Sequence, residues 1–137
     1  MTGVPKRVIG AMVAVLAAAG ASPAPALTDT FRACLVRAGS EPANADCARA
    51  ERDRQERRLK AVWSAVRKAA ARRDRKHVDL LEGAQKRWLV FRQQHCRFVA
   101  TRAVSGSSQA YWGARCAARL NQQRVADLAA RLKAYKR

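Results

Sequence analysis

Cysteines and histidines are the side chains with the most specific chemistry in this sequence, and their spacing favours disulfides. The sequence has four cysteines, Cys34, Cys47, Cys96 and Cys116. No two of them have the C-x2-C spacing that is found in many zinc sites and dithiol redox centres. His95 adjoins Cys96, but neighbouring side chains on a helix point about 100° apart and do not easily converge on one ion. Because the cysteine count is even, we predict two disulfides in an oxidising compartment and no metal site.

Catalysis by the remaining side chains is not expected. The 137 residues include only ten acids and two histidines. His77 lies in a strongly basic segment, and no acid within ten residues of His95 could orient it as a general base. We therefore predict no catalytic residues, no metal and no cofactor, and a protein that acts by binding.

Residues 1–26 have the pattern of a cleavable secretory signal peptide. A positively charged start precedes the apolar run 8–20, and Ala24 and Ala26 fit the small-x-small cleavage rule. The apolar run is too short to span a bilayer, which takes about 20 helical residues. No cysteine follows the cut directly, so we expect no lipid anchor. Residues 27–137 are then expected to be a soluble periplasmic or secreted domain.

The pattern of the mature chain predicts an all-α fold. Seven glycines and four prolines are too few for a sandwich or a barrel. Apolar residues at three- and four-residue spacing predict four helices. They cover about 28–38, a segment capped by Asn44 or Asp46 that runs to 73, about 76–102, and a last helix from the loop 104–108 to the C-terminus. The expected architecture is a small antiparallel helical bundle.

Two helix faces carry further expectations. In the third predicted helix an apolar stripe steps by three and four residues and is expected to face the core: Leu81, Ala84, Trp88, Phe91, His95 and Phe98. In the second, Glu51, Asp53 and Glu56 alternate with arginines. That alternation is typical of ion pairs on a solvated helix surface.

The positions of the cysteines favour one disulfide pairing. Cys96 and Cys116 each lie ten residues from Gly106, so an antiparallel helix hairpin places them at equal height. Cys34 and Cys47 likewise flank the turn that precedes the second helix. We prefer the pairs 34–47 and 96–116, while the two other pairings stay open because helix phase must also agree.

The chain is strongly basic, with 28 Lys and Arg against 10 Asp and Glu and a net charge of +18. Two of these basic residues precede the expected cut, which leaves +16 on the mature domain. One basic cluster surrounds the turn between the second and third helices: Arg67, Lys68, Arg72, Arg73, Arg75 and Lys76. Two interpretations stay open, a solvated surface and an anion-binding site for lipopolysaccharide phosphates, anionic lipids or wall polymers. Nucleic acid is not an expected partner, because stacking aromatics are missing from this cluster.

Several motifs together resemble the LprI-like family of small exported bacterial helical domains. The run 84–96 is similar to its signature Q-x-x-W-x-x-[YF]-R-x-x-x-C, and 116–128 is similar to its C-x3-L-T-x2-R-x3-L run. Cys34 and Cys47 match its two early cysteines. The other matching residues are Gln85, Trp88, Phe91, Arg92, Gly106, Ser107 and Arg124. The chain departs from the family at Lys60, Gln93 and Asn121, where the family usually has Asn, Asp and Thr.

The resemblance implies a binding function, because the named member of the family is a lipoprotein inhibitor of lysozyme. A lysozyme-like glycosidase is then the expected protein partner. The alternative is a basic envelope protein that binds anions and does not inhibit lysozyme.

Gln85, Trp88 and Arg92 fall on one helical stripe, and two interpretations of that stripe stay open. It could be a recognition face, because Trp and Arg are enriched at interface hot spots. It could equally hold a core Trp, with Gln85 and Arg92 bonded to a neighbouring helix near Asn121 and Arg124. Gly106 and Ser107 are expected to serve the turn.

Overall fold

The computed structural model describes residues 26–136, and these form an all-α fold, as predicted. The expected signal peptide lies almost wholly outside the described residues. The helices are α1 (Asp29–Arg37), α2 (Glu41–Ala71), α3 (Arg75–Ala100) and α4 (Gly106–Tyr135). Among the described residues, no helix is long and apolar enough to cross a membrane.

Each helix begins at a polar side chain that accepts a hydrogen bond from a backbone amide three residues further on. The caps are Thr28, Ser40, Asp74 and Ser105. The prediction that Asn44 or Asp46 caps the second helix is wrong, because α2 already begins at Glu41. Pro42 lies in the first turn of α2, where its missing N–H costs no hydrogen bond.

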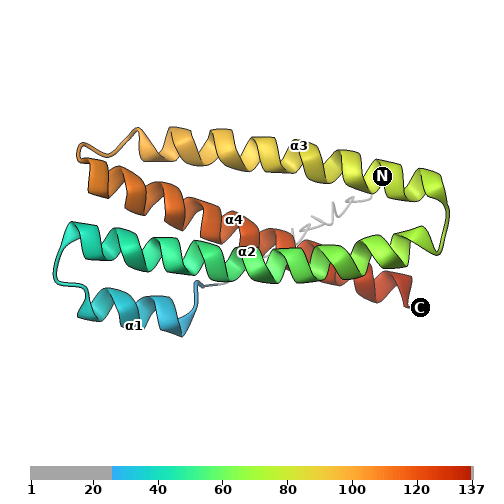
Figure 1. The fold of residues 1–137 in the computed structure, drawn as a ribbon, viewed down its shortest axis with the longest axis horizontal. Coiled ribbons are helices and arrows are strands. Elements are labelled where there is room, and N and C mark those ends of the chain that lie inside the picture. Colours follow the sequence, from blue (N-terminus) through green and yellow to red (C-terminus); the bar gives the residue numbers. More distant parts are fainter. Residues whose placement is uncertain (1–25, 137) are drawn as a thin grey trace, which may run out of the picture.

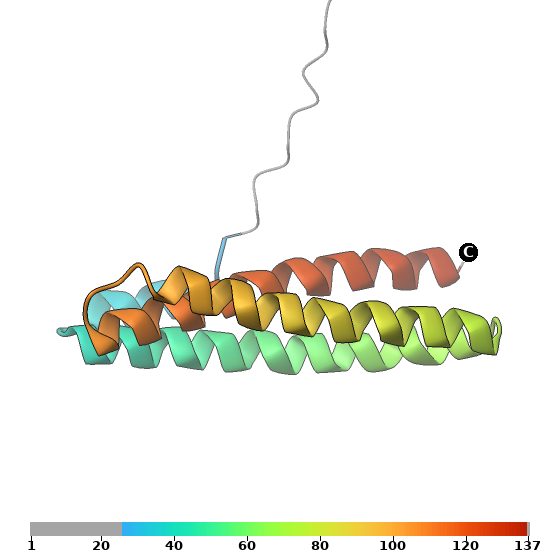
Figure 2. The same ribbon diagram turned by 90° about the horizontal axis from the view of Figure 1, so that it is seen from above.

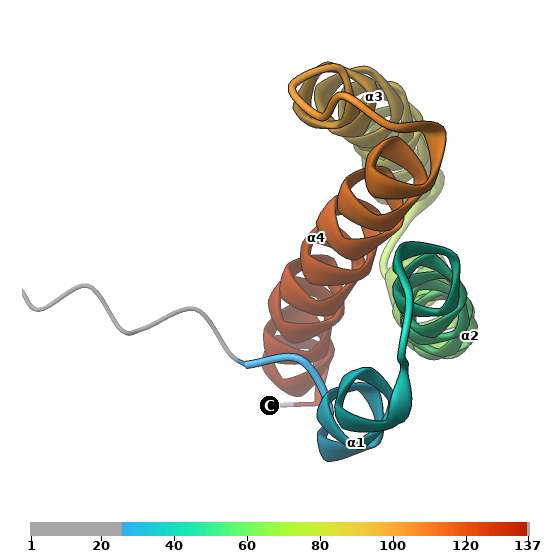
Figure 3. The same ribbon diagram turned by 90° about the vertical axis from the view of Figure 1, so that its left-hand side faces the viewer.

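The three long helices lie side by side, and α1 lies alongside the first half of α2 (Figure 1). Since each helix runs opposite to the one before it, α2 and α4 run in the same direction, and this pair has the most extensive contact. The helix α3 lies at the edge of the array and packs chiefly against α4 (Figure 3). The view from above shows α3 and α4 close together near the loop that joins them and diverging toward the C-terminus of α4 (Figure 2).

Two small apolar clusters form the core. The first joins Phe31 of α1 to Ala48 of α2 and Ala114 of α4. The second joins Leu59 and Val66 of α2 to Leu128 of α4, with Leu81, Trp63 and Trp88 packed against them. Because alanines fill much of the first cluster, burial of apolar surface there stabilises the fold less than leucines would.

The two disulfides have the preferred pairing. Cys34–Cys47 joins α1 to α2 with a Cα–Cα distance of 5.7 Å, and Cys96–Cys116 joins α3 to α4 with one of 5.5 Å. Closing loops of this size in the unfolded chain contributes about 3 kcal/mol each to stability. The covalent links therefore supplement a modest core.

The predicted core stripe of the third helix is wrong at several positions. Phe91 and Phe98 are 52% and 66% exposed, and Ala84 and His95 are also exposed. The buried positions of α3 are Val78, Gln85 and Cys96. An edge helix that packs mainly on one neighbour buries a narrow face, and here that face includes Leu81 and Trp88 but leaves the other residues of the stripe exposed.

The prediction that Glu51 belongs to a solvated row of ion pairs is also wrong. Its side chain is completely buried between α1 and α2. It accepts hydrogen bonds from the Thr28 backbone amide (3.3 Å), the Thr28 hydroxyl (2.7 Å) and Gln55 Nε2 (2.8 Å), and it pairs with Arg54. Burial raises the pKa of Glu51, but these hydrogen bonds and Arg54 outweigh it, so the pKa lies below its ordinary value.

Candidate functional site

The family motif forms a polar network between α3 and α4. Arg92 Nη1 donates to Asn121 Oδ1 over 2.6 Å, and Arg124 Nε donates to Gln85 Oε1 over 3.0 Å. Each helix thus supplies one arginine and one carboxamide. The bonds expected from Gln85 and Arg92 to a neighbouring helix are present, and Asn121 accepts one of them at the position where the family has Thr.

Trp88 lies at the centre of this network. The guanidinium carbons of Arg92 and Arg124 are 5.5 and 5.6 Å from the centre of its ring, a cation–π distance. Its other contacts are with the apolar cluster around Leu128. Burial lowers the pKa of Arg124 from its ordinary value, yet a guanidinium stays charged at neutral pH. These contacts favour the structural interpretation of the motif.

The other motif residues lie apart from the network. Phe91 is exposed and stacks on His95, with ring centres 5.4 Å apart. Gly106 is the first residue of α4, and an added Cβ there would meet nothing within 4 Å. The loop is held instead by Ser105, whose hydroxyl donates to Glu41 Oε2 over 2.7 Å. Ser107 lies half-buried in the first turn of α4.

The basic cluster divides into paired and unpaired members. Arg67 Nε lies 2.5 Å from Glu82 and Arg75 Nε lies 3.1 Å from Asp79, so two of the six charges have acidic partners. Lys76 is exposed in the first turn of α3.

The other three members of the cluster share one hollow. Lys68, Arg72 and Arg73 join Lys136 around a hollow of about 420 Å³ beside Tyr135. The guanidinium carbon of Arg73 lies 6.0 Å from the Tyr135 ring centre. We call this site the Tyr135 hollow. Within residues 26–136, no ion pair involves these four basic residues, so the hollow concentrates positive charge at one end of the molecule.

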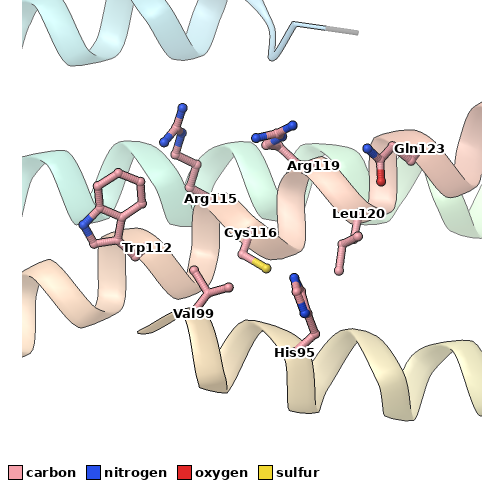
Figure 4. Close-up of a pocket in the computed structure, with 8 residues that line it drawn as sticks. All are labelled: His95, Val99, Trp112, Arg115, Cys116, Arg119, Leu120 and Gln123. Carbon is pink, nitrogen blue, oxygen red and sulfur yellow. The ribbon is translucent and has the colours of Figure 1, made fainter. Parts of the chain in front are cut away.

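A second basic site, which the sequence analysis did not single out, lies between α3 and α4 beside the Cys96–Cys116 disulfide (Figure 4). This groove has a volume of about 310 Å³, and we call it the α3–α4 groove. Its lining includes His95, Trp112, Arg115, Arg119 and Gln123. The signal in the sequence is Trp112-x2-Arg115-x3-Arg119 on a helix in which no acid precedes Asp127.

Arg115 and Arg119 also line a second groove of about 310 Å³, which includes Phe31 and Leu35 of α1. The two arginines therefore form the ridge between the grooves, and Figure 4 shows their side chains extending from α4 toward α1. Among residues 26–136, no acid lines either groove and no ion pair involves Arg115 or Arg119. In the same part of the chain, no three His, Cys, Asp or Glu side chains gather as a metal site would require.

Comparison with known proteins identifies a family. The family model described as "Lysozyme inhibitor LprI" matches residues 34–128, which is more than half of the chain. The match includes all four cysteines and every residue of the network around Trp88. No curated protein and no solved structure matches the chain significantly.

Proposed function

Because the chain belongs to the LprI family of lysozyme inhibitors, we propose that it is an exported binding protein that inhibits a lysozyme-type glycosidase. In this proposal, residues 1–26 are removed on export and residues 27–137 act in the periplasm or outside the cell. The protein has no catalytic activity of its own. The observation that carries the proposal is the family match over residues 34–128.

The structural features inside the matched region support the proposal. The Cys96–Cys116 disulfide and the Arg92–Asn121 and Arg124–Gln85 hydrogen bonds hold α3 and α4 in a fixed relation. A rigid surface loses little conformational entropy on binding, and this favours tight inhibition.

Charge restricts how the partner can be engaged. A domain with a charge of +16 is repelled by a glycosidase that is itself basic, and like charges facing each other cost binding energy. Glycosidases nevertheless carry a pair of carboxyl groups beside the scissile bond. The basic surface is therefore expected to face the acidic catalytic cleft of the partner.

Inhibition is best measured with a soluble chromogenic oligosaccharide, because a polycation could protect a cell-wall suspension merely by coating it. Equimolar mature protein should reduce hydrolysis by a c-type lysozyme, and polylysine of equal total charge should not. Full hydrolysis at a tenfold excess of the protein would contradict the proposal. Hydrolysis of the oligosaccharide by the protein alone would contradict its non-enzymatic part.

A second candidate function rests on the Tyr135 hollow. Lys68, Arg72, Arg73 and Lys136 meet there, and no acid of the described chain lines the hollow. Such a cluster would attract phosphate groups of lipopolysaccharide or anionic lipids, or anionic wall polymers. Binding to vesicles that contain phosphatidylglycerol, with none to phosphatidylcholine vesicles, would favour this function. Lysozyme inhibition in the soluble assay would favour the first.

A further inference from the structure

We propose that the α3–α4 groove binds an anionic saccharide, meaning a sugar that carries a carboxylate or a phosphate group. This is a small-ligand site, and it does not depend on the inhibitor function proposed above. The groove lies between His95 and Val99 of α3 and Trp112 of α4, and the Arg115–Arg119 ridge bounds it (Figure 4).

Positive charge without neutralising partners is the first support. Arg115 and Arg119 are one helical turn apart, and among residues 26–136 neither has an acidic partner. By contrast, Arg32, which lines the neighbouring groove, is paired with Asp29. Guanidinium groups match the geometry of carboxylate and phosphate groups and can bind them through two parallel hydrogen bonds. The ridge therefore selects an anionic group.

The aromatic wall of the groove is the second support. Trp112 is 40% exposed and lines the groove. Its ring has Tyr111 edge-on at 5.2 Å and the guanidinium carbon of Arg115 at 5.1 Å. An indole ring held in this way offers an apolar plane, and the C–H face of a sugar ring fits such a plane. Trp112 and Arg115 can thus contact the ring and the charged group of one ligand.

The groove also offers hydrogen-bond donors and acceptors that could bind the hydroxyl groups of a sugar. His95 and Gln123 line the groove from opposite helices. Stacking on Phe91, with ring centres 5.4 Å apart and planes 20° apart, holds the imidazole of His95 in position. Both residues carry groups that can donate and accept hydrogen bonds, and sugar hydroxyls require both.

The groove is preformed and of suitable size. The Cys96–Cys116 disulfide joins its two walls. A volume of about 310 Å³ is at the lower end of the range for small-ligand sites. One or two sugar rings are the expected ligand.

Calorimetric titration of the mature, oxidised protein at low salt tests the proposal. The probes are N-acetylmuramic acid, which carries a carboxylate, glucose 6-phosphate, which carries a phosphate, and neutral N-acetylglucosamine. We expect saturable one-site binding of at least one charged sugar and at least tenfold weaker binding of the neutral one. The preferred charged probe distinguishes a carboxylate ligand from a phosphate ligand.

Variants locate the binding. The double variant Arg115→Gln/Arg119→Gln should weaken binding of the charged sugar at least tenfold, and Trp112→Ala should weaken binding of the same probe without changing its charge preference. The matched control Arg87→Gln/Arg97→Gln removes the same charge from exposed positions of α3 outside the groove and should change the affinity less than twofold. Unchanged melting temperatures would show that every variant folds.

Three results would overturn the proposal. The first is no saturable binding of either charged sugar up to tens of millimolar. The second is an equal loss of binding in the arginine variant and its control, because that indicates attraction by net charge alone. The third is undiminished binding by both folded groove variants, because the ligand would then lie elsewhere.

Discussion

At the scale of single residues, the surroundings of Trp88 show most directly how the sequence pattern relates to the structure. Gln85, Trp88 and Arg92 fall on one side of a helix at spacings of three and four, and Asn121 and Arg124 do so on the facing helix. One of the two interpretations left open by the sequence included bonds between these sets, and the structure contains two of them. The exposure of Phe91 could not be predicted from the sequence. Periodicity shows which residues share one side of a helix, but it does not show how many of them a neighbouring helix covers.

Trp88→Ala should lower the free energy of unfolding by about 3 kcal/mol, the lower end of the range for large aromatic truncations, because Trp88 is only partly buried. Both Arg92 and Arg124 would also lose their cation–π contact. Thermal unfolding followed by circular dichroism should show a melting temperature lower by more than about 10 °C.

The control for this prediction is Phe98→Ala on the same helix. Its side chain is 66% exposed, so the free energy of unfolding should change by less than about 0.5 kcal/mol. A Trp88→Ala protein as stable as this control would contradict the structural interpretation of the motif and favour a recognition role for Trp88.

Glu51 predicts how stability depends on pH. Its pKa in the folded protein lies below the ordinary value of 4.5, so its ionised form stabilises the fold above pH 4.5. This contribution is lost as the pH falls through the lowered pKa. Glu51→Gln should be about 1–3 kcal/mol less stable than the wild type at neutral pH, and the difference should narrow toward pH 3.

Urea unfolding at a series of pH values measures this difference. Asp53→Asn is the matched control, because Asp53 is two residues away and pairs with Arg52 at an exposed position. Its stability should follow the wild-type curve at every pH. A constant difference between wild type and Glu51→Gln from pH 7 to pH 3 would contradict a lowered pKa.

At the scale of elements, the four helices and both disulfides could be predicted from the sequence, and the helix boundaries less well. Gly39 lies in the break between α1 and α2, and Pro42 lies in the first turn of α2. The rotation of α3 could not be predicted, because it depends on α2 and α4 being the dominant pair. The sequence pattern did not single out Trp112, Arg115 and Arg119, because the grooves that they line form only where α3 and α1 lie beside α4.

The two disulfides should differ in the region that they stabilise. The helix α1 has nine residues, and an isolated helix of that length is unstable in water. Cys34→Ser/Cys47→Ser should therefore remove hydrogen-exchange protection mainly from α1. Cys96→Ser/Cys116→Ser should lower the global free energy of unfolding by about 3 kcal/mol. Equal exchange in α1 for the two double variants would contradict this assignment.

The turn between α2 and α3 contains both unpaired and paired basic residues, and this allows a matched comparison. Lys68→Gln/Arg72→Gln removes charges at the Tyr135 hollow, while Arg67→Gln/Arg75→Gln removes charges that face Glu82 and Asp79. The first variant should bind phosphatidylglycerol vesicles more weakly and with a flatter salt dependence than the second. Equal vesicle binding by both would indicate that net charge alone matters. In both variants, the free energy of unfolding should fall by no more than about 0.5 kcal/mol per substitution.

At the scale of the whole molecule, export and oxidation belong to one prediction. The domain has a modest core and two disulfides, and such disulfides persist in oxidising compartments. Cleavage after Ala26 would leave Leu27 at the N-terminus, next to Thr28, which caps α1 and binds Glu51. Among the contacts of the described residues, it would remove the hydrogen bond that the Ala26 carbonyl accepts from Gln122 Nε2 over 2.8 Å. The cut therefore leaves the contacts of Thr28 in place.

The intact mass of the protein secreted from its host, measured without reduction, checks this last prediction. It should equal that of residues 27–137 less the four hydrogen atoms lost in forming two disulfides. Reduction should then add these four hydrogens and expose four thiols to alkylation. A mass that retains residues 1–26 would contradict signal cleavage. Alkylation of the unreduced protein would contradict the oxidised state, and with it the disulfide links of α1 to α2 and of α3 to α4.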